Sequence, residues 1–307
     1  MTPPRLGVVI VTHRAADTID ACLGSLLASE GVTLRVVVVD NASPDDTLTR
    51  LRAHDVTVIE APNDGFAAGV NRGLAVLSAD AGLDRFWVLN PDTTVATDTA
   101  RRFATHPALP GGFAMIGGRV LYDETPPRIQ IDGGTIDWRS GVTRNLNQFA
   151  PADAPPPDPA EIAFVTGASL VVSRAFLDVA GPMPEDYFLY YEEVDWAMRR
   201  GALPLLHCPD AMVRHVSGAS IGSASGDRRA SPFSEWFKHR ARMMFLRRHR
   251  PASVPGGLAF TTAKAAQHLS RGDFAAARAT WAGGFGLGPP RDVRVTMAAA
   301  GIDPARL

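Results

Sequence analysis

The chain has 307 residues, of which 46% are hydrophobic and 21% are charged, so it can bury a substantial core. Its 31 basic and 32 acidic residues give a net charge of -1, so no global field marks it as a nucleic-acid-binding protein, and we expect no nucleic-acid partner. The two cysteines, Cys22 and Cys208, are too few for a disulfide framework and are typical of a reducing compartment.

The first apolar run extends from Leu6 to Val11. It is too short for a signal-peptide core or a membrane span, so we interpret it as a buried first strand. We expect a cytoplasmic protein whose contact with a membrane, if it has one, is peripheral and at the inner face.

The first third of the sequence alternates short β-branched runs with helical patterns, which is typical of βαβ units. The expected strands cover residues 6–12, 34–39, 56–60 and 85–89, and the expected helices cover 15–29, 45–53 and 66–79. The strands are continuously apolar, as in a sheet with both faces covered. The fold class is therefore α/β.

The pattern changes after residue 115, where Gly-rich punctuation through residue 149 favours hairpins and is followed by a proline-rich loop over 150–160. A second structured block follows. Its expected elements are a strand over 162–172, helices over 174–180 and 191–200, and strands over 204–208 and 211–216. From Pro232 to about Gly284 the pattern is helical.

Asp40 and Asn41 directly follow the second expected strand. In open α/β sheets the carboxyl ends of parallel strands bind ligands, and a carboxylate there can accept hydrogen bonds from a nucleobase or ribose. Ser43 or Asp45 could be present only to cap the next helix, although capping does not account for Asp40.

A glycine-rich stretch from Asn63 to Gly73 follows the third strand. Gly65 precedes a helix whose small residues permit close approach of the backbone to a ligand, so the helix amides and Arg72 could face a diphosphate. The alternative is that these glycines serve only turns and packing.

The fourth strand runs directly into Asn90, Pro91 and Asp92, at the same edge of the sheet as Asp40. This position suits a hard divalent cation, because Mg²⁺ and Mn²⁺ take oxygen ligands and keep water or substrate phosphates in their shell. A proline turn with a capping aspartate is the competing interpretation.

In this order, the motifs resemble those of glycosyltransferase family 2, particularly its rhamnosyltransferase-like branch. The resemblance covers about residues 6–220. It is carried by residues 9–14 (VIVTHR), 38–43 (VVDNAS), 63–73 (NDGFAAGVNRG), 89–93 (LNPDT), 167–174 (GASLVVSR), 187–196 (YFLYYEEVDW) and 213–215 (VRH).

The resemblance implies a GT-A-type fold, with a Rossmann-like nucleotide-binding sheet, and inverting sugar transfer to a saccharide or lipid-linked saccharide hydroxyl. The donor would be a nucleotide-diphosphate sugar such as a dTDP- or UDP-sugar, and rhamnosyl transfer in cell-wall or other cell-surface polysaccharide synthesis fits the branch. It also implies a divalent cation, Mg²⁺ or Mn²⁺, held by Asp92 and His215. The implied donor-binding residues are Thr12, His13, Arg14, Asp40, Asn41, Asn63, Gly65, Phe66, Asn71, Arg72, Asn90 and Asp92.

Acceptor activation falls, by the same resemblance, to the acidic run after Tyr191. A carboxylate opposite the leaving group can deprotonate the acceptor hydroxyl, and in-line attack then inverts the anomeric carbon. Glu193 is the candidate base and Glu192 the runner-up, while Asp195 could orient Arg199 or bind acceptor hydroxyls. The competing interpretation is that this charge only favours a helix N-terminus.

The resemblance divides residues 1–230 into a donor half, 1–115, and an acceptor half, 116–230, followed by a helical C-terminal extension over 231–307. Within that extension, residues 238–250 form a basic stretch that is either a solvated helix packed on the domain or a surface for anionic headgroups or a lipid-linked diphosphate. A homodimer is left open.

Two other functions remain to be distinguished. A sugar-nucleotidyltransferase would also use an α/β nucleotide site and a metal, but it would place a glycine-rich, basic phosphate loop after the first strand, where Thr12 to Ala16 stand instead. A non-catalytic module that binds nucleotide sugars or glycans is the second alternative. It would release no nucleoside diphosphate from the donor.

Overall fold

The computed structural model describes residues 2–216 and 230–304. Its main sheet has nine strands in the order β3-β2-β1-β4-β10-β6-β11-β5, with β7 paired beside β6, and β8 and β9 form a separate hairpin. The strands are β1 (Arg5–Thr12), β2 (Thr33–Asn41), β3 (Thr57–Ala61), β4 (Arg85–Leu89), β5 (Thr93–Val95), β6 (Met115–Tyr122), β7 (Ile129–Ile131), β8 (Gly134–Asp137), β9 (Val142–Asn145), β10 (Ser169–Ser173) and β11 (Leu205–His215).

The first four strands run parallel and are connected through helices, as predicted. Thr12 pairs with Asp40, so the carboxyl ends of β1 and β2 lie level at one edge of the sheet. The apolar residues of β1 and β4 are buried, because helices and loops cover the sheet. The connecting helices are α1 (Ile19–Leu27), α2 (Thr47–Leu51) and α3 (Phe66–Ser78).

The prediction of hairpins over 115–149 is only partly correct. Strand β6 pairs antiparallel with β7, and β8 pairs antiparallel with β9, but β6 is also a buried member of the main sheet, which the pattern did not indicate. The glycines of β6 are packing devices, since a Cβ on Gly118 would lie 2.3 Å from the carbonyl oxygen of Ala211. The two strands expected over 204–216 are one strand, β11, whose register shifts between Cys208 and Met212.

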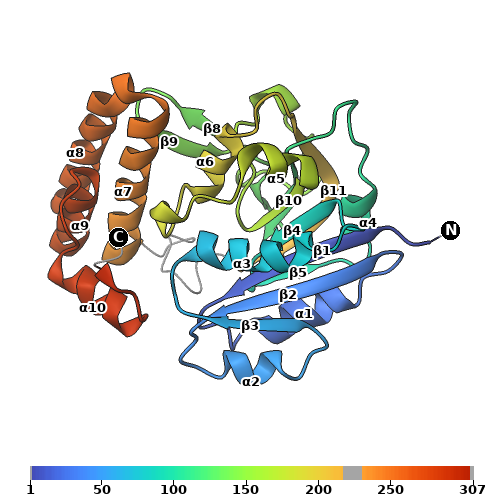
Figure 1. The fold of residues 1–307 in the computed structure, drawn as a ribbon. Helices are drawn as coiled ribbons and strands as arrows, with labels where there is room; N and C mark the ends of the chain where they lie inside the picture. The colour runs from blue at the N-terminus through green and yellow to red at the C-terminus, as the bar shows by residue number, and fades with distance from the viewer. Residues whose placement is uncertain (1, 217–229, 305–307) are drawn as a thin grey trace.

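The remaining helices of the sheet domain are short, and four longer helices follow. Figure 1 shows the C-terminal helices gathered at one end of the molecule, beside the sheet domain. The prediction of helices up to Gly284 missed the last one. The helices are α4 (Thr99–Thr105), α5 (Arg174–Ala180), α6 (Glu192–Met198), α7 (Pro232–His249), α8 (Val254–Ser270), α9 (Phe274–Gly284) and α10 (Arg291–Ala299), with 3-10 turns η1 (Pro159–Glu161), η2 (Glu185–Tyr187) and η3 (Pro251–Ser253).

The basic stretch 238–250 lies on α7, and much of this helix is buried rather than solvated. Phe245 stacks on Trp138, with ring centroids 5.6 Å apart, so α7 packs directly onto the sheet domain. Arg248 Nη1 donates to Asp195 Oδ2 at 2.6 Å. Arg248 is therefore engaged in ion pairs within the protein, whereas the neighbouring Arg247 is exposed. That the stretch meets anionic headgroups or a lipid-linked diphosphate stays a prediction.

A buried polar network holds α7 against α8 and α9. His239 Nε2 lies 3.4 Å and His268 Nε2 3.6 Å from Glu235 Oε2, and Thr280 Oγ1 donates to the same oxygen at 3.3 Å. Burial would raise the pKa of Glu235, but the hydrogen bond and charge of His239 outweigh it and lower that pKa to about 2. Burial lowers the pKa of His239 to about 4.

This network predicts a loss of stability in acid that a His239→Gln variant should lack. An unfolded histidine binds a proton below about pH 6.5, whereas native His239 stays neutral down to about pH 4. Between pH 7 and 4 the wild type should therefore lose about 3 kcal/mol of unfolding free energy relative to the variant. Denaturant titrations of both proteins across this range measure the difference, and a constant difference would contradict the prediction.

Candidate active site

Asp40 is buried at the carboxyl end of β2 and is oriented from two sides. Thr12 Oγ1 donates to Asp40 Oδ1 at 2.8 Å, and the Ser43 amide donates to Asp40 Oδ2 at 3.0 Å. Each carboxylate oxygen can accept two hydrogen bonds, so Oδ2 keeps acceptor capacity for a ligand donor such as a ribose hydroxyl. Ser43 therefore orients Asp40 and does not cap the following helix.

Two further acceptors at this edge have no hydrogen-bond partner among the residues that the structure describes. His13 Nδ1 lies 2.9 Å from the Asn41 carbonyl oxygen, so Nδ1 carries the proton and Nε2 is a bare acceptor. The Asn41 amide donates to the Gly65 carbonyl at 3.0 Å, which leaves Asn41 Oδ1 as an acceptor. Both His13 Nε2 and Asn41 Oδ1 are buried without a hydrogen-bond partner. Unmet buried acceptors cost on the order of 1–3 kcal/mol and call for an explanation.

Asp92 and His215 meet at the end of β4, as the resemblance implied. His215 Nε2 lies 3.1 Å from Asp92 Oδ1, and Asp92 Oδ1 is buried without a hydrogen-bond partner. His215 Nδ1 lies 2.8 Å from Gln130 Oε1 and can donate to it, so in the neutral ring Nε2 presents a lone pair toward Asp92. At 3.1 Å, Asp92 Oδ1 and His215 Nε2 can share either a proton on Nε2 or a cation bound between them.

The pair therefore fits a divalent cation. In the described part of the chain no three histidine, cysteine or acidic side chains group as a metal site, so protein ligands alone would not complete a coordination shell. Mg²⁺ and Mn²⁺ characteristically fill their shells with water and phosphate oxygens. Asp92 and His215 would hold such an ion, with the remaining positions left for a diphosphate.

Gln130, on β7, is a site residue that sequence reasoning missed. Replacing it by leucine should weaken Mn²⁺ affinity about 10–100-fold, because His215 loses the hydrogen bond that fixes its tautomer and orientation. Calorimetric titration of Mn²⁺ in the presence of nucleoside diphosphate measures this change. Gln130→Glu keeps an acceptor for His215 Nδ1 and is the matched control. Equal Mn²⁺ affinity in the Leu variant and the wild type would contradict the assignment.

The acidic run begins α6, and the turn before it is strained. Phe188, Tyr190 and Tyr191 have φ values of 67°, 69° and 70°, which cost on the order of 1–2 kcal/mol each for residues with side chains. Tyr191 Oη donates to the Gly141 carbonyl at 2.7 Å and holds this turn against the β8–β9 hairpin. The turn fixes where Glu192 and Glu193 start the helix.

Glu192 and Glu193 are adjacent acids whose pKa values are both raised. Burial raises the pKa of Glu193 to about 7. Burial, and then the charge of Glu193, raise the pKa of Glu192 well above its usual value. Glu193 therefore titrates near neutrality, which suits a general base. A Cβ on Gly167 would lie 3.9 Å from Glu193 Cδ, and the neighbouring Ala168 carbonyl accepts from the Asn90 amide at 3.0 Å. The segment 167–168 thus lies between Glu193 and the turn that carries Asp92.

Asp195 occupies a different environment from the pair. Its carboxylate is fully buried and accepts from Tyr187 Oη and Arg199 Nε, each at 2.7 Å, and from Arg248 Nη1 at 2.6 Å. Burial would raise the pKa of Asp195, but these donors lower it. The expected contact with Arg199 is present. With both oxygens engaged, Asp195 is suited to positioning α6 rather than to binding acceptor hydroxyls.

Three of the expected donor-binding residues contact the 183–188 segment. They are Gly65, Phe66 and Asn71. The side-chain amide of Asn71 donates to the Met183 carbonyl at 2.9 Å and to Glu185 Oε1 at 2.7 Å. We therefore revise its expected role from binding the nucleotide sugar to positioning this loop. Arg72 pairs with Asp64 rather than facing open space. A Cβ on Gly65 would lie 2.7 Å from the Phe188 carbonyl oxygen, which also accepts from the Phe66 amide.

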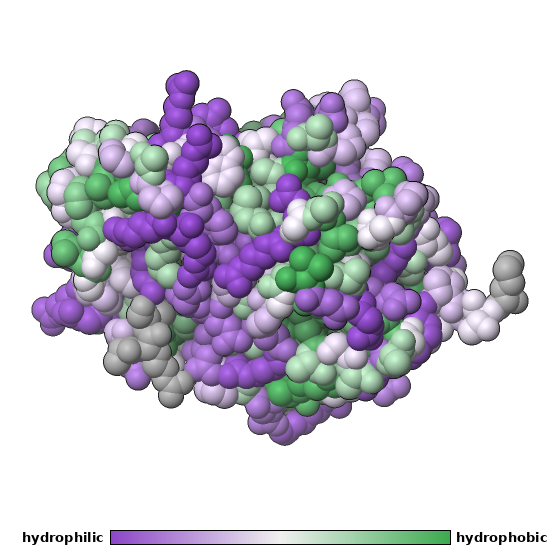
Figure 2. Space-filling model, turned by 45° about the horizontal axis from the view of Figure 1, so that its top comes forward, coloured by the Kyte–Doolittle hydropathy of each residue, from purple (hydrophilic) through white to green (hydrophobic). Residues whose placement is uncertain are grey.

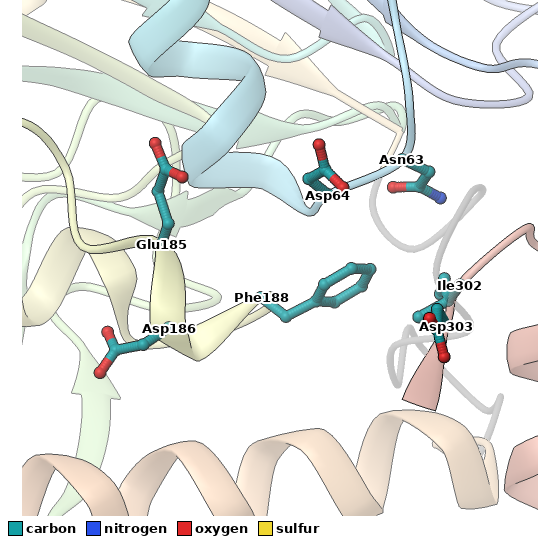
Figure 3. A pocket seen from close by; sticks show the side chains of 7 residues that line it. All are labelled: Asn63, Asp64, Glu185, Asp186, Phe188, Ile302 and Asp303. Atoms are coloured by element: carbon teal, nitrogen blue, oxygen red, sulfur yellow. The ribbon is translucent and has the colours of Figure 1, made fainter. Parts of the chain in front are cut away.

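The end of α10 reaches the remaining two expected donor-binding residues. Arg14 Nη2 donates to the Ala299 carbonyl, and Asn63 Nδ2 donates to the Ala300 carbonyl at 3.0 Å. No pattern before α10 indicated this contact, because it joins segments far apart in the sequence. Beside it lies a cavity of about 280 Å³. Figure 3 shows its lining residues, with the Phe188 ring extending toward Ile302: Asn63, Asp64, Glu185, Asp186, Phe188, Ile302 and Asp303.

Comparisons with known proteins agree with this geometry. Residues 7–149 match the family model described as Glycosyl transferase family 2. The chain is 24% identical over 202 residues to the low-salt glycan biosynthesis hexosyltransferase Agl10 of Haloferax volcanii, covering 63% of this chain and 61% of the relative, which is less than two thirds of that protein's length. It is 27% identical over 244 residues to the N-acetylglucosaminyl-diphospho-decaprenol L-rhamnosyltransferase of Mycobacterium tuberculosis, covering 71% of this chain and 78% of the relative.

Among solved structures, the mannosyltransferase PcManGT from Pyrobaculum calidifontis in complex with GDP-Man and Mn²⁺ has a similar fold. The TM-score is 0.53 at 18% identity, and the match covers 99% of this chain and 86% of the other. At this identity the likeness concerns the fold alone. It confirms the expected GT-A-type architecture.

Proposed function

Because this chain belongs to glycosyltransferase family 2, with residues 7–149 matching the family model, we propose that it is an inverting, metal-dependent hexosyltransferase. One observation carries the proposal. Asp92 Oδ1 and His215 Nε2 face each other at 3.1 Å, at the sheet edge where Asp40 also lies. A cation bound between them would neutralise charge on a departing diphosphate.

In this proposal the residues divide the work of one transfer. Asp40, held by Thr12 and Ser43, accepts a hydrogen bond from the nucleoside, and Asp92 and His215 hold the metal. Glu193 takes the proton from the acceptor hydroxyl as that oxygen attacks the anomeric carbon. Attack opposite the leaving diphosphate inverts the configuration, by analogy with inverting glycosidases.

The cavity lined by Phe188, in the turn before α6, supports the proposed binding of a saccharide acceptor. Four of its seven lining residues are acidic and none is basic, which disfavours a diphosphate and suits the hydroxyl donors of a sugar. The Phe188 ring adds an apolar face. Residues 1–115 would hold the donor, 116–230 the acceptor, and 231–307 would support both.

The substrates are proposed by analogy with the relatives. The mycobacterial relative is named for transfer of L-rhamnose to N-acetylglucosaminyl-diphospho-decaprenol. We infer a dTDP- or UDP-sugar donor and a saccharide acceptor, free or lipid-linked, in cell-surface polysaccharide synthesis. The expected cytoplasmic location stays a prediction.

A panel of nucleotide sugars tests the function. With Mn²⁺ present, one donor among dTDP-rhamnose, UDP-glucose, UDP-N-acetylglucosamine and GDP-mannose should raise Tm, and the protein should slowly release nucleoside diphosphate from it. A shift in Tm without any release, even with acceptor saccharides added, would favour the binding module. Release of pyrophosphate from a nucleoside triphosphate and a sugar phosphate would favour the nucleotidyltransferase.

A further inference from the structure

Helix α9 has its large and small apolar residues on unexpected sides. Its buried face consists of alanine, threonine and glycine, and a Cβ on Gly283 would lie 2.2 Å from the Trp236 carbonyl oxygen of α7. Its outward face carries Phe274, 71% exposed, and Trp281, 42% exposed. A helix that packs in a globular core normally presents its bulky apolar side chains inward. The pattern indicates a second apolar environment outside α9.

The outward residues form one continuous stripe. Phe274, Arg278, Trp281 and Phe285 follow at intervals of four, three and four residues, which places them on one side of a helix. The Trp281 and Phe285 rings stack with their centroids 4.3 Å apart. Leu287, 55% exposed, extends the stripe past the end of α9. We call these five residues the α9 stripe.

The C-terminal part of the chain, which carries the α9 stripe, is rich in basic residues although the whole chain is nearly neutral. Residues 232–307 carry 12 arginines and lysines against 4 aspartates and glutamates, whereas the full chain has 31 against 32. Both lysines of the chain, Lys238 and Lys264, are in this part. Figure 2 shows hydrophobic patches among hydrophilic side chains on the side of the molecule where the C-terminal helices lie.

We propose that the α9 stripe docks onto an anionic lipid bilayer, with its aromatic rings at the boundary between headgroups and acyl chains. Tryptophan and phenylalanine on a basic helix suit that boundary, and arginines there pair with lipid phosphates. A second copy of the chain would bring two positive surfaces together, which like-charge repulsion disfavours. None of the described helices is both long and apolar enough to cross a bilayer. The docking is a surface contact and is independent of glycosyl transfer.

Co-sedimentation with vesicles tests this docking on the full chain. The wild type should bind vesicles of phosphatidylglycerol and phosphatidylcholine, bind phosphatidylcholine alone weakly, and be released as salt rises. Phe274→Ser combined with Trp281→Ser should weaken binding at least about 10-fold, because two large apolar side chains no longer enter the bilayer. The matched control is Leu109→Ser with Val179→Ser, which removes two exposed apolar residues, 52% and 58% exposed, from the sheet domain.

Several results would overturn the proposal. They are a wild type that ignores anionic vesicles, equal binding by the Phe274/Trp281 variant, or equal weakening by the control. Tryptophan fluorescence quenched by brominated lipid in the wild type and in Phe274→Ser, but much less in Trp281→Phe, would place Trp281 in the bilayer even if the double variant folds poorly. If sedimentation velocity shows a dimer that Trp281→Phe dissociates, and vesicles do not compete with it, the occupant is a second copy and the membrane proposal fails.

Discussion

A Glu193→Gln variant is expected to lose about 10²–10⁴-fold in kcat, which is the usual contribution of general-base catalysis. Glutamine keeps the shape of the side chain but cannot take a proton. Donor binding should be unchanged, because the base faces the acceptor rather than the nucleotide. Initial rates at saturating donor, with donor affinity measured by calorimetry, separate the two effects.

The wild type should also show a matching pH profile. The pKa of Glu193 is raised to about 7 by burial, so the free base accumulates only as pH rises through neutrality. kcat/KM should therefore rise with pH and level off above about 7. This rising limb should be absent from the residual activity of Glu193→Gln.

Glu192→Gln is the internal control for that assignment. Glu192 is buried, and burial raises its pKa and favours its neutral form, so a neutral glutamine should change kcat only mildly. A Glu193→Gln enzyme with near-normal turnover beside an inactive Glu192→Gln enzyme would exchange the two roles. Near-normal turnover in both would move the base elsewhere, and Asp195 would be tested next.

Asp92→Asn should reduce kcat/KM by about 10²–10³-fold, comparable with the loss of one preorganised group that stabilises developing charge. Without its carboxylate the site no longer offers a charged ligand to the cation, so nucleoside diphosphate should bind much more weakly in Mn²⁺. The free nucleoside, which Asp40 contacts in the proposed mechanism, should bind almost as before. Calorimetry with both ligands measures the contrast.

Asp98→Asn is the matched control, since Asp98 is a partly exposed acid just before α4 that pairs with Arg102 at 2.7 Å. It should leave Mn²⁺-dependent binding unchanged. Equal losses of diphosphate and nucleoside affinity in Asp92→Asn would show that Asp92 shapes the pocket rather than holding the metal.

The parts of the fold that could be predicted are those written in local patterns. Strands β1, β2 and β4 contain continuous buried apolar runs, and β3, an only partly buried strand at the sheet edge, has a short β-branched run, so their residues alone indicate them. Strand β6 was harder because Gly117 and Gly118 resemble turn residues, yet Gly118 is needed where the Ala211 carbonyl approaches. Helix α10 was not predicted because the segment before it is rich in glycine and proline, and because the helix is stabilised by contacts with distant residues.

The same limit applies to the candidate site. Asp40 and Asp92 lie at the ends of β2 and β4, and the sheet brings strand ends together, so their positions alone indicated them. His215, at the end of β11, was indicated only by the family resemblance. Gln130 stands on a three-residue strand with no motif, and only its 2.8 Å contact with His215 distinguishes it. Asn71 was misread because its motif indicates a ligand, whereas its amide donors are used by the 183–185 segment.

The contact between Arg14 and the Ala299 carbonyl joins residues 285 positions apart. Closing so large a loop costs entropy that must be met before the contact contributes any stability, and such non-local pairings slow folding. During synthesis β1 leaves the ribosome first, yet the loop after it must wait for nearly the whole chain before its guanidinium finds this partner. The loop after β1 is therefore among the earliest segments made and among the last to be completed.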